Sequence, residues 1–268
     1  MTVTVHPSAL VEAGAEIGDG SVIGPFCVVG ARAKIGPGVT LKSHVVVDGR
    51  TTIGEKTTVF PFAAIGTQPQ DLKFKGEESE LFIGARCMIR ENVTINPGTE
   101  GGGLVTRVGS NCSILAGAHV AHDCLIGDNV ILVNNVLLGG HVEIGDYAIM
   151  GGGSAVHQFV RIGAHAMIGG MSGVENDVIP YGSVIGNRAH LAGLNIVGLK
   201  RRGFQRQQIH DLRHAYRLLF AEEGTMEERI EDVAQLYATN EVVMEIVNFI
   251  RKDSSRAICQ PSKADRAA

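Results

Sequence analysis

An aliphatic residue recurs at every sixth position along most of the chain. The spacing holds over Val5–Ile65, returns over Ile83–Ile95 and continues over Val108–Val174. All 26 of these positions are aliphatic, although the chain as a whole is only 44% hydrophobic. A period of six suits neither a helix nor a two-residue alternation, but it suits short strands separated by turns. The pattern therefore predicts a mainly β repeat structure.

The other positions of the repeat support this interpretation. Gly follows the aliphatic residue in 14 of the 26 units, where it can accommodate a turn. The residue four places after the aliphatic one is Ala, Ser, Thr, Cys or Val in every unit but one. Four of the five cysteines stand at this position, and we interpret them as packing residues of an inner corner: Cys27, Cys87, Cys112 and Cys124.

Two stretches, residues 67–82 and 97–107, interrupt the repeat and are predicted to be loops. Insertions in repeat proteins tend to collect on the binding face. Asp71 and Lys73 lie close together in the first stretch, so we expect a functional role for that loop. For the second stretch we expect a tolerated surface loop.

The hydrophobic spacing becomes helical after Pro180. Thr225 and Glu228 form the sequence pattern of a capping box, which predicts the start of a helix. The predicted helices span residues 204–222, a segment beginning after Thr225, and about 240–251. We divide the chain into a β domain of residues 1–190 and a helical domain of residues 191–268, with a loose tail from Ser254 onward.

Composition excludes several classes of protein. The formal net charge of −4 gives no indication of nucleic-acid binding. The N-terminus lacks the basic and apolar regions of a signal peptide, and no run of about 18 apolar residues predicts a membrane span. The cysteines form no CxxC pair and predict no disulfide framework, so we expect a cytoplasmic protein.

The most distinctive polar stretch is residues 119–158, which holds four of the ten histidines. Three repeat units make 18 residues, so residues 18 apart should stack. His122 then aligns with Gly140 and Gln158, while Asp123 aligns with His141. His119 and His157 fall beside these two columns.

These columns suit general-base chemistry. Free imidazole titrates at about 6.5, so His122 can accept a proton near neutral pH. A carboxylate such as Asp123 can hold the imidazole in one tautomer, and Gly140 can offer a bare backbone N–H to an oxyanion. No nucleophile elbow or obvious Ser or Cys nucleophile is present, which favours direct group transfer.

The repeat resembles that of the hexapeptide-repeat transferases, whose fold is a left-handed parallel β-helix with three hexads in each coil. The left hand is implied by this resemblance, because the ordinary crossover rule predicts a right-handed connection. Several segments further resemble the UDP-N-acetylglucosamine O-acyltransferase family of lipid A biosynthesis. They are residues 70–73, 118–124, 134–135, 139–141, 155–158, 162–165 and 195–204.

The resemblance implies a role for each site residue. His122 is the base for the sugar 3-hydroxyl, Asp123 supports it, and the Gly140 N–H holds the thioester oxyanion. Asp71 and Lys73 bind glucosamine, while Asn195 and Arg201 bind the uridine diphosphate. Contacts to the acyl donor and the sugar nucleotide are implied for His119, His141, His157 and Gln158.

The resemblance also implies a homotrimer that takes its acyl group from acyl carrier protein, without cofactor or metal. Gly170 is implied to limit the acyl chain and, having no side chain, predicts a long 3-hydroxyacyl donor. The basic run of residues 200–202 is either a carrier-protein contact or a solvated turn. The chain departs from the family pattern at Asn96 and at Val197, so one nucleotide contact is in doubt.

Three alternatives remain open at this point. Another hexapeptide acyltransferase, using acetyl-CoA or acting on an amino group, would share the repeat and the base. A zinc enzyme of the γ-carbonic anhydrase type also shares the fold, but His119, His122 and His141 do not follow its ligand pattern. A purely structural solenoid would explain the repeat but not the polar columns.

Overall fold

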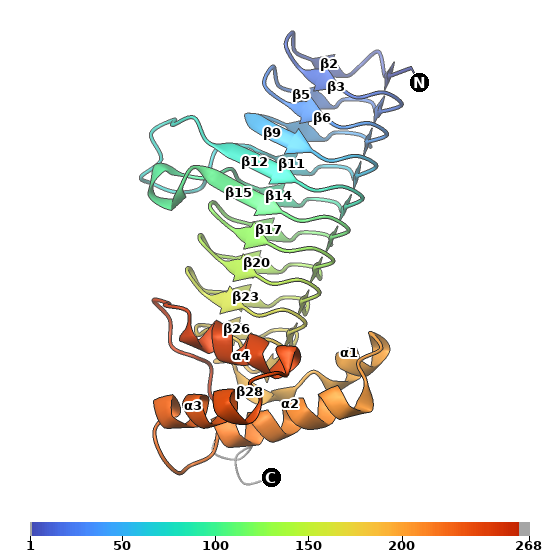
Figure 1. Cartoon of the computed structure of the whole chain (residues 1–268). Coiled ribbons are helices and arrows are strands. Elements are labelled where there is room, and N and C mark those ends of the chain that lie inside the picture. The colour runs from blue at the N-terminus through green and yellow to red at the C-terminus, as the bar shows by residue number, and fades with distance from the viewer. Residues whose placement is uncertain (1, 263–268) are drawn as a thin grey trace.

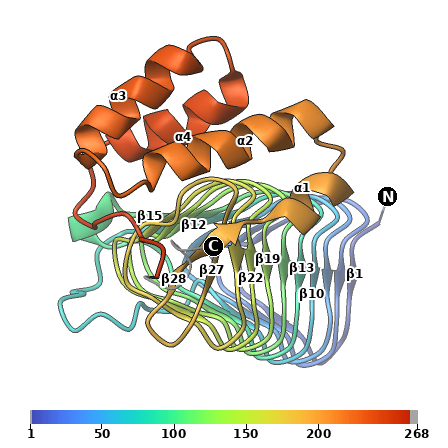
Figure 2. The same cartoon turned by 90° about the horizontal axis from the view of Figure 1, so that it is seen from below.

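The computed structural model describes residues 2–262 and shows a left-handed parallel β-helix followed by a helical region (Figure 1). Three sheets, named A, B and C here, form the sides of a triangular prism that Figure 2 shows end-on. Successive strands pass from A to B to C, and strands of neighbouring coils pair in register, as Thr4 does with Val22.

The strands of the three sheets are short. Sheet A contains β1 (Thr4–Val5), β4 (Val22–Ile23), β7 (Thr40–Leu41), β10 (Thr58–Val59), β13 (Met88–Ile89), β16 (Ser113–Ile114), β19 (Ile131–Leu132), β22 (Ile149–Met150), β25 (Met167–Ile168), β27 (Gly182–Ile185) and the antiparallel β28 (His190–Leu194). Sheet B contains β2 (Leu10–Val11), β5 (Val28–Val29), β8 (Val46–Val47), β11 (Ala64–Ile65), β14 (Thr94–Ile95), β17 (His119–Val120), β20 (Leu137–Leu138), β23 (Ala155–Val156) and β26 (Gly173–Val174). Sheet C contains β3 (Glu16–Ile17), β6 (Lys34–Ile35), β9 (Arg50–Ile53), β12 (Glu80–Ile83), β15 (Val105–Val108), β18 (Leu125–Ile126), β21 (Glu143–Ile144) and β24 (Arg161–Ile162).

The predicted repeat is confirmed strand by strand. Each of β1–β26 ends at one of the 26 aliphatic repeat positions. From Ile23 onward every one of these side chains is buried, and each contributes roughly 1.5–3 kcal/mol through burial. The four cysteines at the inner corner position are buried and unpaired, as their interpretation as packing residues required.

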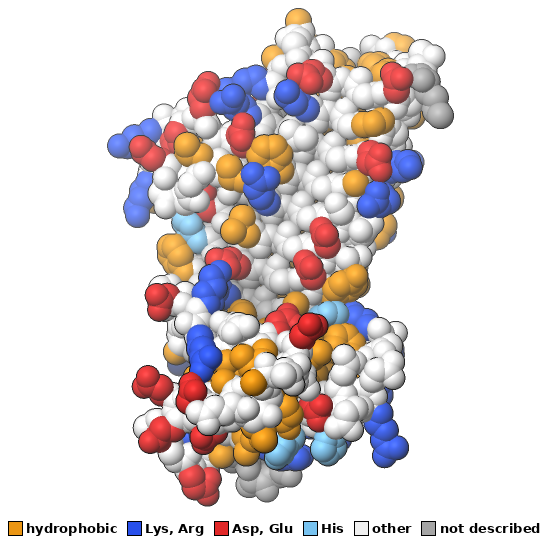
Figure 3. Space-filling model, viewed as in Figure 1, with side chains coloured by type: hydrophobic (Ala, Val, Ile, Leu, Met, Phe, Trp, Pro, Cys, Tyr) orange, Lys and Arg blue, Asp and Glu red, His pale blue; other side chains and the backbone are white. Residues whose placement is uncertain are grey.

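Both interruptions leave the prism at the corner between sheets B and C, on successive coils. The first joins β11 to β12 and the second joins β14 to β15. Because β12 begins at Glu80 and β15 at Val105, the predicted loops of residues 67–82 and 97–107 extend a few residues too far. Charged side chains of both signs gather on this protruding part of the molecule (left in Figure 3).

The helical region contains α1 (Ile196–Arg201), α2 (Arg206–Leu219), α3 (Met226–Leu236) and α4 (Glu241–Arg251). The three predicted helices are confirmed, and Thr225 and Glu228 form the predicted capping box. Helix α1 was not predicted; it begins where the Asn195 side chain accepts a hydrogen bond from the Gly198 N–H at 3.0 Å. No helix within residues 2–262 is long and apolar enough to cross a membrane.

The prediction of a loose tail from Ser254 was wrong for residues 257–261. Ile258 pairs with Asp177 of the last coil, and Pro261 pairs with Leu191 of β28. Residues 263–268 of the predicted tail lie outside the described residues. The repeat did not predict that the chain returns to the β-helix here, because this C-terminal segment does not follow the six-residue period.

A buried ion pair joins the last coils to the helical region. Arg161 Nε donates to Asp177 Oδ2 at 2.7 Å, and the guanidinium lies over the Phe249 ring of α4 at 4.5 Å. Both partners are almost fully buried. Because a lone charge in such a place would be costly, each residue depends on the other.

An aromatic column marks the corner between sheets C and A. Tyr147, His165 and Tyr181 stack on successive coils with ring centroids 5.0 and 5.5 Å apart. Burial, reinforced by the Arg202 guanidinium, lowers the pKa of His165 to about 4. Burial of this imidazole is therefore tolerated only in its neutral form.

The His165 pKa predicts a pH dependence of stability. Between the ordinary pKa of 6.5 and about 4, the unfolded chain binds a proton that the folded chain does not. Stability should therefore fall as the pH is lowered through this window. His165→Phe keeps an aromatic ring but cannot titrate, so its melting temperature should fall less than that of the wild type between pH 7 and pH 4. Parallel pH profiles for the two proteins would contradict this assignment.

Candidate functional site

The predicted polar columns lie at the corner between sheets B and C. His122, Gly140 and Gln158 occupy equivalent places between β17 and β18, β20 and β21, and β23 and β24. The coils are tied here by backbone hydrogen bonds, from His141 N to His122 O at 3.0 Å and from Phe159 N to Gly140 O at 3.1 Å. The 18-residue alignment of these residues is therefore confirmed.

The corner requires a left-handed backbone conformation at one position in each coil. Asp123, His141 and Phe159 occupy that position with φ values of 61°, 61° and 65°. Asp and His tolerate this region better than most residues, because their short polar side chains can bond locally. The turn thus fixes the direction in which Asp123 and His141 project.

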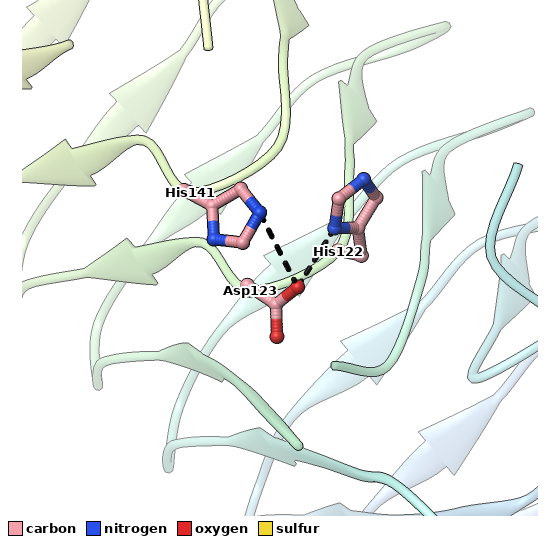
Figure 4. Close-up of side chains that lie close together, drawn as sticks. All are labelled: His122, Asp123 and His141. Carbon is pink, nitrogen blue, oxygen red and sulfur yellow. Dashed lines mark hydrogen bonds and ion pairs between the residues drawn. The ribbon is translucent and has the colours of Figure 1, made fainter. Parts of the chain in front are cut away.

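His122 and Asp123 form a hydrogen-bonded dyad (Figure 4). His122 Nδ1 lies 2.7 Å from Asp123 Oδ2, and the Asp123 side chain is only 1% exposed. A carboxylate can only accept, so Nδ1 carries the hydrogen and Nε2 keeps its lone pair. The His122 ring is 13% exposed, so substrate can reach it. The dyad is therefore prepared to take up a proton at Nε2.

The second loop holds the Asp123 carboxylate. Thr99 donates its N–H to Asp123 Oδ1 at 2.8 Å and its hydroxyl to Oδ2 at 2.6 Å. Asp123 N in turn donates to Thr106 Oγ1 at 2.7 Å. The expectation that this interruption is only a tolerated surface loop was therefore wrong. A sequence signal existed, since Thr99 stands four places after Ile95, at the inner position of the repeat.

Gly140 leaves the space that the His122 ring occupies. A Cβ at residue 140 would lie 2.5 Å from His122 Cε1, closer than real atoms approach. The Gly140 N–H donates to no acceptor among the described residues. A free backbone donor beside the imidazole can stabilise negative charge that develops on a substrate oxygen.

His141 completes the group. Its ring meets the His122 ring edge-on with centroids 5.1 Å apart and stacks on Phe159 at 4.4 Å. Burial lowers the pKa of His141, although Asp123 and the loop residue Asp71 act in the opposite direction. The electrostatic effect of Asp71 places the first loop near this group. A lowered pKa makes His141 a weaker base than an ordinary histidine, and its neutral ring can donate one hydrogen bond and accept another.

His119 and His157 lie on either side of these columns. His119 Nδ1 is 2.7 Å from Thr94 Oγ1, and burial lowers the pKa of His119. His157 and Gln158 are exposed one coil beyond Gly140. Arg256, which sequence analysis missed, contacts both of them from the returning C-terminal segment.

Lys73 is exposed, and its backbone N–H donates to Asp71 Oδ1 at 3.0 Å within the first loop.

The remaining predicted residues lie at other corners of the same chain. Asn195 donates to His165 O at 2.9 Å, which places it and α1 at the corner between sheets C and A. Arg201 ends α1 and is exposed. Gly170 follows β25 and precedes β26, at the corner between sheets A and B. A single chain therefore does not bring these three residues to the His122 dyad.

His122, Asp123 and His141 also place possible metal-ligand atoms within 4.8 Å of one another. A metal bound at His122 Nδ1 would have to displace its hydrogen bond to Asp123, and any metal would compete for Asp123 oxygens that already accept from Thr99. We therefore interpret the group as an acid–base site. The expected absence of a metal stays a prediction.

Known proteins resemble this chain over nearly its full length. A family model described as UDP N-acetylglucosamine O-acyltransferase, domain 2, matches residues 177–259. A second model, described as bacterial transferase hexapeptide, matches residues 14–49 and 106–140. The acyl-[acyl-carrier-protein]–UDP-N-acetylglucosamine O-acyltransferase of Caulobacter vibrioides is 54% identical over 97% of this chain and 99% of its own. That of Methylobacterium radiotolerans is 62% identical over 76% of this chain and 75% of its own.

Solved structures agree. A UDP-N-acetylglucosamine acyltransferase crystal structure matches with a TM-score of 0.94 at 44% identity, covering 97% of this chain and 100% of that one. The Francisella novicida enzyme matches with a TM-score of 0.95 at 38% identity, covering 99% of each chain. The chain therefore belongs to the acyl-[acyl-carrier-protein]–UDP-N-acetylglucosamine O-acyltransferase family of hexapeptide-repeat transferases.

Proposed function

We propose that the protein transfers a long-chain (R)-3-hydroxyacyl group from acyl carrier protein to the glucosamine 3-hydroxyl of UDP-N-acetylglucosamine, the first step of lipid A biosynthesis. The observation that carries this proposal is the His122–Asp123 dyad, whose Nε2 lone pair is available beside the unbonded Gly140 N–H. Family membership supplies the two substrates. The geometry supports the assignment of His122 as the base and of the neighbouring Gly140 N–H as the oxyanion donor.

In the proposed reaction, His122 Nε2 takes the proton of the acceptor hydroxyl as its oxygen attacks the thioester carbon. The Gly140 N–H stabilises the oxyanion of the tetrahedral intermediate. Collapse of the intermediate breaks the C–S bond, and the carrier thiolate leaves with the proton returned by the imidazolium. General-base catalysis of this kind is worth about 10²–10⁴-fold in rate.

The substrate contacts follow from charge and placement. Lys73 and Arg201 are both exposed cations. Lys73 would bind the glucosamine unit together with Asp71, and Arg201 would bind the uridine diphosphate, because a guanidinium can donate two parallel hydrogen bonds to a phosphate. Asp71, His119, His141, His157 and Gln158 would line the path of the sugar and the acyl donor. Asn195 would act beside Arg201, although its side chain already caps α1.

A homotrimer would bring the three corners together. The outward positions of sheets A and B carry no charged residue, whereas sheet C carries Glu16, Lys34, Arg107, Glu143 and Arg161. Leu10 and Leu137 on sheet B are more than half exposed in the single chain. Uncharged faces that expose apolar side chains are typical of subunit interfaces. In a three-fold arrangement, sheet A of one chain would face sheet B of the next. The His122 corner of one chain would then meet the Asn195 corner of its neighbour, and Gly170 would lie at the inner edge of the same interface.

The proposed function is tested by product analysis. Purified protein is incubated with UDP-N-acetylglucosamine and a 3-hydroxyacyl carrier protein, and the sugar nucleotide is examined by mass spectrometry and NMR. We expect one acyl group in ester linkage at the 3-position. An acylated product only with a 3-amino acceptor, or only with acetyl-CoA as donor, would instead support the alternative sugar acyltransferases.

Thr99→Val is predicted to slow catalysis. The substitution keeps the shape and the backbone N–H but removes the hydroxyl that donates to Asp123. A hydrogen bond to a charged group is worth about 1.5–3 kcal/mol, so kcat should fall roughly tenfold or more while KM changes little. Thr52→Val, on the outer face of sheet C, is the matched control. Equal kcat values for both variants would show that Thr99 does not support the dyad.

Gly170→Met is predicted to shorten the preferred acyl chain. Gly170 is exposed, and the nearest atom to an added Cβ is Gly152 O at 3.2 Å, so a side chain fits with a small adjustment. Such a side chain would fill the end of the acyl groove in the trimer. Donors of graded length are compared for the wild type, Gly170→Ala and Gly170→Met, and preference should shift with side-chain size. Unchanged selectivity would exclude Gly170 from the groove.

A further inference from the structure

The C-terminal segment after α4 returns to the end of the polar columns. Asp177 lies 18 residues after Phe159 and so continues the column of Asp123 and His141. Asp177 N donates to Ala257 O at 2.9 Å, and Cys259 N donates to Asp177 O at 2.8 Å. The segment therefore takes the place that one more coil would occupy, and its backbone is fixed beside the site.

Arg256 reaches from this segment to two consecutive site residues. Its Nη2 lies 2.6 Å from His157 Nδ1, and its Nε donates to Gln158 O at 3.0 Å. A guanidinium can only donate, so His157 Nδ1 must accept. The remaining ring hydrogen is then on Nε2. Arg256 thus selects the neutral Nε2–H tautomer of His157.

The opposite tautomer is available to His157 when Arg256 is absent. His157 Nδ1 lies 3.3 Å from Gln158 O, which could accept a hydrogen from a protonated Nδ1. In that arrangement Nε2 would be an acceptor instead of a donor. The shorter contact with the obligate donor Arg256 decides between the two arrangements.

We propose that Arg256 is a positioning residue of the acyl-transfer site, which makes His157 a hydrogen-bond donor to substrate through Nε2–H. The proposal rests on the proposed function. The dyad fixes His122 in the opposite tautomer, with Nδ1 protonated and Nε2 free to accept. Two histidines of neighbouring columns are therefore held in opposite states, one by a carboxylate and the other by a guanidinium.

The test combines imidazole ¹⁵N NMR of His157 with steady-state kinetics. In the wild type we expect the Nε2–H tautomer, and in Arg256→Ala a change toward Nδ1–H. Loss of a charged hydrogen-bond donor should lower kcat/KM about tenfold in Arg256→Ala. In a His157→Ala background the same substitution should change kcat/KM less than about twofold, because coupled residues are not additive.

Two further variants keep the result interpretable. Arg256→Lys retains a cationic donor and should keep the Nε2–H tautomer, with a smaller kinetic loss than Arg256→Ala. Lys252→Ala removes the exposed ion pair with Glu143 at the end of α4 and should leave both readouts unchanged.

A wild-type-like His157 tautomer in Arg256→Ala would overturn the proposal, and so would additive losses in the double variant. The tautomer of His157 is measured without turnover and therefore tests the role of Arg256 alone. Failure of the wild-type protein to acylate the sugar nucleotide would refute the proposed function without affecting that result.

Discussion

The stacking of one coil on the next is the constraint on which the site depends. A neighbouring coil pairs in register, so a side chain at a corner has a neighbour 18 residues away. His122 and Gly140 are each tied to the next coil by a backbone hydrogen bond, not carried on a long flexible loop. Residues carried on rigid elements keep the geometry that proton transfer requires.

The second constraint is the burial of Asp123. Its carboxylate accepts hydrogen bonds from Thr99 N at Oδ1 and from Thr99 Oγ1 and His122 Nδ1 at Oδ2, so each buried oxygen has a partner within the protein. The loop that supplies Thr99 leaves the same corner as the coil that supplies the dyad. The insertion therefore contacts the dyad at the point where it departs from the repeat.

Sequence periodicity predicted the β-helix because each strand ends at a residue whose side chain must be buried. The same period placed Asp123 beneath His141 and Gly140 beside His122, since both pairs depend only on coil length. It placed Thr99 at an inner position but could not predict its bonds to Asp123, because the chain leaves the repeat directly after Thr99. It could not predict the contacts of Arg256, because the C-terminal return has no register in the repeat. Helix α1 escaped detection because six residues carry too little hydrophobic pattern.

The most direct measurement compares acyl transfer to UDP-N-acetylglucosamine by the wild type and by His122→Ala under single-turnover conditions. Removing the base should lower the rate by about 10²–10⁴-fold, while the folded state is retained. His214→Ala, which alters a histidine hydrogen-bonded to Tyr237 in the helical region, serves as the control and should keep the wild-type rate. A His122→Ala protein that transfers the acyl group at the wild-type rate would show that His122 is not the catalytic base.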